Sequence, residues 1–165
     1  MITLVCPHAT VAALCSHITA QLVTFNDLPD LLLHVEVEPN FSRNGYAVAN
    51  GLQSQPAFYV RSERKIFVNA ELFLLAEHTE QVSILAHEIA HAVRHHLGEE
   101  NSLQTLNELE TDRLACLWGF HSEVLASRSR TEGEEYIACL CLWRDEEKFR
   151  KAAGCLATRK LAGLA

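Results

Sequence analysis

The stretch Ser83–His96, "SILAHEIAHAVRHH", contains four histidines and one glutamate in an otherwise mostly apolar segment. If the segment is an amphipathic helix, His87 and His91 lie on the same face, one turn apart, and can share one metal ion. Glu88 lies about 100° further round the helix and can reach a water molecule on that metal. Gly98 follows after Leu97, and a glycine at such a position commonly ends a helix. The stretch therefore predicts a metal-binding helix.

His87, Glu88 and His91 form the H-E-x-x-H pattern of zinc peptidases. A catalytic zinc ion (Zn²⁺) takes three protein ligands and leaves its fourth position for water, so a third ligand is needed. The segment "TLNELETD" supplies candidates, because Glu108 and Asp112 share a helix face. We predict Glu108 as the ligand and keep as the alternative Glu110, which points roughly 200° away from Glu108.

The expected elements surround this pair of segments. Upstream we expect a helix over Ala9–Leu22 and another around Ala70–Glu77. Between them we expect short strands, in the segments Leu31–Glu38, "NGYAVANG", "PAFYV" and Ile66–Val68. Downstream we expect helices over Ser102–Ala126 and Glu132–Ala153, and a short tail helix after Gly154. A helix, a small sheet and then helices indicate a single α+β domain.

That domain, residues 1–165, divides into four regions. They are the N-terminal helix and sheet (about 1–78), the active-site helix (about 79–97, with Thr79 as its cap), the helix with the glutamate ligand (about 102–126) and the C-terminal helices (about 132–163). We expect a mostly antiparallel sheet that packs on the active-site helix.

"HEIAH" followed by "ELETD" resembles the gluzincin metallopeptidases, whose signature is H-E-x-x-H and then E-x-x-x-D. "ELETDRLA" is similar to the E-x-x-A-D-R-x-A segment of HtpX and CAAX-prenyl-protease-type enzymes, except for Thr111, where alanine is usual. "NGYAV" and "KIFVNAEL" resemble two further segments of those proteins. The chain lacks their membrane spans, so soluble minigluzincins are the better comparison. ImmA/IrrE-like regulatory peptidases have a similar layout.

The resemblance implies a zincin-like fold and a zinc-dependent metalloendopeptidase. Zinc would polarise the scissile carbonyl and lower the pKa of its bound water, and Glu88 would act as general base and then acid. Asp112 would accept a hydrogen bond from the far nitrogen of a histidine ligand. His121 is a candidate donor to the oxyanion, with a loop histidine of no catalytic role as the alternative.

A polypeptide substrate would bind as an added strand beside "GYAVA" or "AFYV". Two other functions stay open: a dedicated regulatory protease that cuts one cellular partner such as a repressor, and a non-catalytic zinc-bearing interaction module. The presence of Glu88 argues against the interaction module.

Charge and hydropathy exclude two classes of partner. The net charge is −7 and no long basic stretch occurs, so we expect no nucleic-acid binding. No apolar run reaches the roughly 18 residues of a membrane span, and the N-terminus has no basic region typical of a signal peptide. We expect a cytoplasmic protein without membrane association, whose six cysteines are reduced and mostly buried.

Overall fold

The computed structural model describes residues 1–25 and 27–163. Its elements, in chain order, are β1 (Ile2–Val5), α1 (Ala9–Leu22), β2 (Leu31–Glu38), α2 (Gly45–Asn50), β3 (Ala57–Val60), β4 (Lys65–Asn69), α3 (Ala70–Phe73), α4 (His78–Leu97), α5 (Gln104–Ala115), a π-helical turn (Cys116–Phe120), α6 (His121–Thr131), α7 (Glu134–Leu140) and α8 (Glu146–Leu161). The α+β class and the helical C-terminal half are confirmed.

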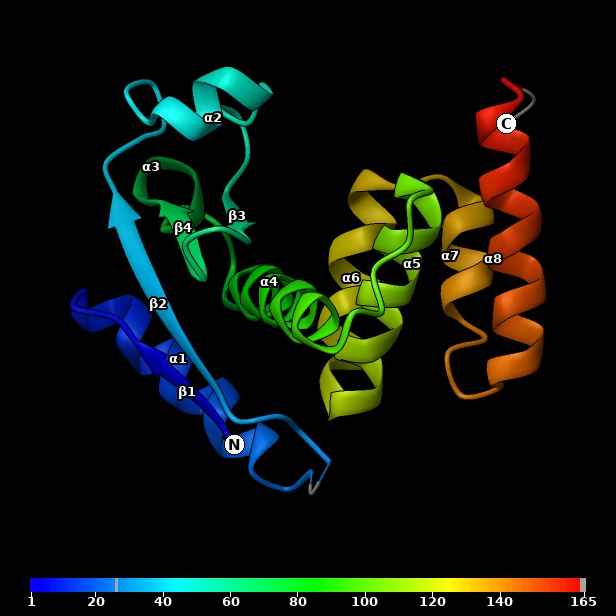
Figure 1. Cartoon of the computed structure of the whole chain (residues 1–165), viewed down its shortest axis with the longest axis horizontal. Coiled ribbons are helices and arrows are strands. Elements are labelled where there is room, and N and C mark those ends of the chain that lie inside the picture. The colour runs from blue at the N-terminus through cyan, green and yellow to red at the C-terminus, as the bar shows by residue number, and fades with distance from the viewer. Residues whose placement is uncertain (26, 164–165) are drawn as a thin grey trace.

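The helix α4 lies at the centre of the molecule (Figure 1). The sheet and α1 lie on one side of it, and α5 to α8 lie on the other. Its apolar side chains are buried against both layers; these are Val82, Leu85, Ala86, Ile89, Ala90, Ala92 and Val93. The helix ends at Gly98, whose φ of 70° is left-handed, as predicted. It begins at His78, slightly earlier than the predicted cap at Thr79.

The sheet has the strand order β1-β2-β4-β3. β1 pairs with β2 and β2 pairs with β4 in parallel, whereas β3 and β4 form the predicted antiparallel hairpin. The prediction of a mostly antiparallel sheet is therefore wrong. The physical reason is the connection: α1 stands between β1 and β2 in the chain and gives the long crossover that a parallel pair requires.

The segment "NGYAVANG", predicted as a strand, forms the helix α2 instead. The Asn44 side chain accepts a hydrogen bond from the Ala47 N–H at 2.9 Å, which caps the N-terminus of the helix. Gly51, with φ of 68°, ends it. The first and last residues of the segment, Asn44 and Gly51, are thus the caps of a helix. Of the two predicted sites for an added strand, only β3 is a strand, and it lies at an edge of the sheet.

The single helix predicted over 102–126 is interrupted by the π-helical turn. Gly119 has a φ of 96°, and a Cβ on it would lie 2.7 Å from Gln21 Nε2, so glycine suits both the backbone and the close approach. The helix predicted over 132–153 is also divided, because Asp145 caps a new helix, α8. α8 continues through Gly154 to Leu161, so the described residues after Gly154 form no separate tail helix.

Among the residues that the structure describes, no helix is long and apolar enough to cross a membrane.

Candidate active site

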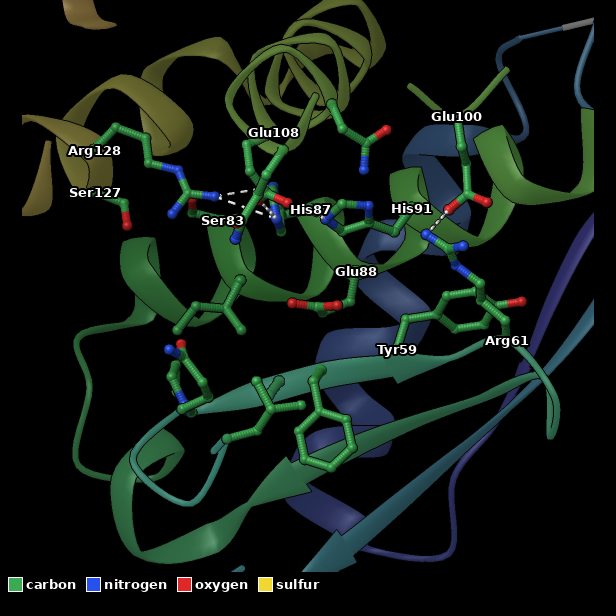
Figure 2. A pocket seen from close by; sticks show the side chains of 18 of the residues that line it. Tyr59, Arg61, Ser83, His87, Glu88, His91, Glu100, Glu108, Ser127 and Arg128 are labelled. Carbon is green, nitrogen blue, oxygen red and sulfur yellow. Dashed lines mark hydrogen bonds and ion pairs between the residues drawn. The ribbon is translucent and has the colours of Figure 1, made fainter. Parts of the chain in front are cut away.

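A cleft of about 600 Å³ lies beside α4 and is lined by residues of β3, α4, α5, the α4–α5 connection and α6. His87, Glu88, His91 and Glu108 all line it. Figure 2 shows these side chains between the strand β3 and the helix α5. The structure therefore brings the predicted base and the three predicted ligands into one cavity.

His87, His91 and Glu108 each offer a ligand atom, and the three atoms lie within 4.8 Å of one another. The Glu108 carboxylate lies between the two rings, with Oε2 at 3.1 Å from His87 Nε2 and Oε1 at 3.4 Å from His91 Nε2. Two imidazole nitrogens and a carboxylate oxygen are ligands that a catalytic zinc ion takes in proteins. The donor set and its spacing fit one zinc ion.

The other ring nitrogen of each histidine has a partner of its own. His87 Nδ1 lies 2.7 Å from Asp112 Oδ1, and His91 Nδ1 lies 3.3 Å from the Thr111 hydroxyl. Such contacts orient histidine rings so that the opposite nitrogen is free to bind metal. The contact between Asp112 and His87 has the geometry that the sequence predicted.

Asp112 is fully buried and holds two further groups that the sequence did not reveal. Arg128 donates from Nε to Oδ2 at 2.7 Å and from Nη2 to Oδ1 at 3.0 Å, and the Tyr136 hydroxyl donates to Oδ2 at 2.6 Å. Arg128 Nη2 also lies 2.9 Å from His87 Nδ1. A guanidinium only donates, and His87 Nδ1 faces the Asp112 carboxylate. We therefore interpret Arg128 Nη2 and His87 Nδ1 as two neighbouring donors that share the acceptor Asp112 Oδ1.

The charges in this cluster determine its pKa values. Burial alone would raise the pKa of Asp112, but His87 and Arg128 hold it well below its usual range. Burial and Arg128 lower the pKa of His87, yet Asp112 and Glu108 outweigh them and raise it to about 9. The two carboxylates thus favour a positive charge at this ring, and a bound metal cation would supply one.

Glu88 projects from α4 into the cleft next to the two histidines (Figure 2). It follows His87 in the chain, so the helix turns its side chain away from the ligand face and toward β3. Only 9% of its surface is exposed. This position can serve a group that exchanges a proton with a water or substrate in the cleft.

Glu110, the alternative ligand, lies outside the ligand group. Its carboxylate accepts a hydrogen bond from the buried guanidinium of Arg94. His121 is not among the residues that line the cleft. It begins α6 and stacks on Trp143, with ring centroids 5.4 Å apart. The structure therefore does not bring His121 to the other predicted site residues.

Sequence reasoning missed Arg128 and Tyr136. Arg128 lies in the short basic cluster "SRSR", Ser127–Arg130, and Tyr136 lies in an expected helix, and neither belongs to a ligand motif. The residues lie 16 and 24 positions after Asp112. No helical spacing links residues so far apart, so the only signal was the need of a buried carboxylate for partners.

One end of the cleft carries an ion pair between two connecting segments of the chain. Arg61, which follows β3, lies 2.7 Å from Glu100, which follows α4. Close by, the Tyr59 hydroxyl lies 3.1 Å from His95 Nδ1, which ties β3 to the last turn of α4. In Figure 2 the pair spans this end of the cleft, on the far side of His91 from Arg128.

Comparison with known proteins gives one family. The family model of Peptidase family M48 matches residues 23–144, which include the cleft residues from β3, α4, α5 and α6. The chain matches no curated protein and no solved structure. The matched range covers most of the chain and contains the metal-binding group, and the chain therefore belongs to peptidase family M48, a family of metal-dependent peptidases.

Proposed function

We propose that the protein is a zinc-dependent endopeptidase whose general base is Glu88. The observation that carries the proposal is the convergence of His87, His91 and Glu108 in a cleft that Glu88 also lines. Three protein ligands leave one coordination position of zinc for a water or substrate, which is the arrangement of catalytic rather than structural zinc sites.

A zinc ion in this site would polarise the scissile carbonyl and make a water molecule acidic enough to ionise near neutral pH. Glu88 would accept the proton of that water and then deliver it to the leaving amine. Asp112 would hold His87 in the orientation that leaves Nε2 for the metal. Arg128 and Tyr136 would keep Asp112 ionised and in place.

We propose β3 as the strand along which the substrate binds. It lies at the edge of the sheet, and its residues Ala57, Phe58 and Tyr59 line the cleft. An extended peptide can pair with such an edge through its main chain, and alternate side chains then point to the two sides. The Arg61–Glu100 ion pair narrows one end of the cleft, so the peptide would enter from the other end or displace the pair.

The test combines metal analysis with a cleavage assay. The purified protein should contain close to one zinc per chain and should cut peptides in a proteome-derived library read by mass spectrometry. Glu88→Gln should keep the zinc and the fold but lose the cleavage, because the amide cannot accept the proton. Equal cleavage by both proteins would overturn the assignment of the base. Zinc retained by His87→Ala/His91→Ala would overturn the site itself.

A further inference from the structure

Thr111 lies on α5 between the glutamate ligand and Asp112 and is fully buried. Its hydroxyl has three polar neighbours, which come from two helices. The Asn107 carbonyl oxygen lies at 2.7 Å, Arg94 Nη1 at 2.9 Å and His91 Nδ1 at 3.3 Å. A threonine hydroxyl has one hydrogen to donate and two lone pairs to accept with, so three contacts use its full capacity.

The chemistry of the neighbours decides which contact is which. A backbone carbonyl only accepts, so Thr111 donates its hydrogen to Asn107. A guanidinium only donates, so Arg94 fills one lone pair of Thr111. The remaining lone pair can only receive a hydrogen, and the available donor is His91 Nδ1–H. His91 therefore carries a hydrogen on Nδ1, so in the neutral ring the lone pair is on Nε2.

Nε2 is the atom of His91 that faces Glu108, at 3.4 Å. We propose that Thr111 is a positioning residue that fixes the tautomer and orientation of His91 for metal binding. The proposal rests on the metal site of the proposed function. Thr111 would then orient His91 as Asp112 orients His87, with a neutral hydroxyl in place of a carboxylate.

Arg94 keeps the Thr111 hydroxyl from turning. Arg94 is buried, with only 3% of its surface exposed. The carbonyl oxygen and Oδ1 of Asn107 also lie 2.7 and 2.8 Å from Nη1, so the two hydrogens of Nη1 are shared among three acceptors, one of which is the Thr111 hydroxyl. Nη2 donates to the Glu99 carbonyl oxygen at 2.6 Å and to the Glu110 carboxylate. With so many partners the guanidinium is held firmly, and it fixes the direction of the lone pair left for His91.

The arrangement depends on the residue type at this position. Alanine, which is usual here in the peptidases that the segment resembles, would offer His91 no acceptor. Valine has nearly the shape of threonine but no hydroxyl, so Thr111→Val removes the contact with little change in volume. Serine keeps the hydroxyl, so Thr111→Ser should preserve the contact. The pair of substitutions separates the hydrogen bond from packing.

The experiment measures the zinc affinity of the full chain by competition with a chromophoric chelator at fixed pH and salt. Thr111→Val should weaken zinc binding by about tenfold, at the low end of the roughly 10–100-fold range for groups that orient ligands. Thr111→Ser should stay within about threefold of the wild type, as a conservative rescue of the same contact. The matched control is Thr105→Val on the same helix, since the described structure shows no hydrogen bond of that hydroxyl; it should leave the affinity unchanged. Wild-type affinity in Thr111→Val, or equal loss in the valine and serine variants, would overturn the proposal.

A second measurement needs no variant. Nitrogen-15 NMR of the histidine rings in the wild-type protein reports which nitrogen of His91 carries the hydrogen. We expect a hydrogen on Nδ1 both with and without zinc; without zinc, the Glu108 carboxylate can hold a second hydrogen on Nε2. A His91 ring with no hydrogen on Nδ1 overturns the proposal even if Thr111→Val does not fold. If the wild type binds no zinc, the proposed function fails, whereas the tautomer still tests the contact between Thr111 and His91.

Discussion

Replacing Asp112 by alanine should destabilise the protein even before metal is considered. The substitution removes a fully buried carboxylate that accepts hydrogen bonds from Tyr136 and Arg128 and contacts His87. Arg128, whose side chain is only 22% exposed, would lose its counter-charge. Removal of one partner of a buried ion pair costs about 3–5 kcal/mol, and the residual exposure of Arg128 places our expectation at about 3 kcal/mol.

The measurement is urea unfolding in the presence of a chelator, because bound zinc would itself stabilise the folded protein and mask the effect. Tyr136→Phe is the graded comparison: it removes one hydrogen bond to the same carboxylate and should cost about 1.5–3 kcal/mol. Zinc affinity, measured separately, should fall roughly 10–100-fold in Asp112→Ala. It should fall much further in Glu108→Ala, which removes a ligand.

Two results would refute the reasoning. A loss of less than about 1 kcal/mol in Asp112→Ala would mean that the carboxylate is not buried in a charged network, since that is the range of surface pairs. Zinc affinity that fell more in Asp112→Ala than in Glu108→Ala would mean that the ligand and its neighbour have been assigned in the wrong order.

Three further predictions concern other parts of the molecule. Glu88→Gln should lower turnover of a cleaved peptide by at least about 100-fold at unchanged zinc content, as expected for loss of a general base; activity within tenfold of wild type would contradict it. Gly119→Ala should lower the free energy of unfolding by about 1–3 kcal/mol, measured by thermal unfolding, because the φ of residue 119 is 96°. The control is Gly154→Ala, inside α8 with open space around it, which should raise the free energy of unfolding by about 0.5–1 kcal/mol. Burial raises the pKa of two thiols to about 12, namely Cys15 and Cys116. At pH 8 a thiol reagent should therefore modify the exposed Cys141 and Cys155 first, and fast labelling of all six cysteines in the folded protein would contradict the structure.

The parts of the fold that follow from local periodicity could be predicted from the sequence. The position of α4, its end at Gly98 and the hairpin of β3 and β4 depend on residues that are neighbours in the chain or in one element. The same is true of His87, His91 and Glu88, because a helix fixes their relative directions. The contact of Asp112 with one of the two histidines could also be predicted, since the four-residue spacing from Glu108 places both carboxylates on one face; that the histidine is His87 comes from the structure.

The errors have a common physical cause, which is that some short signals have two structural meanings. Asparagine and glycine border strands, but Asn44 and Gly51 cap a helix here, and only the packing of α2 decides between the two. The apolar pattern between Gln104 and Thr131 continues across Gly119, so periodicity alone does not reveal the break. The strand β1 is only four residues long, and its parallel pairing with β2 depends on how α1 packs.

Arg128 and Tyr136 also show why the helical C-terminal half matters to the site. Without them, Asp112 would be a buried carboxylate held by His87, which also contacts the Glu108 carboxylate, while Glu88 lines the same cleft as His87 and Glu108. Such a concentration of negative charge in a poorly solvated cleft is unfavourable unless cations balance it. In the proposed site, the Arg128 guanidinium and one divalent metal ion would together balance the charges of Glu88, Glu108 and Asp112. We therefore expect the long-range contact of α6 with Asp112 to support the proposed binding of a single zinc ion.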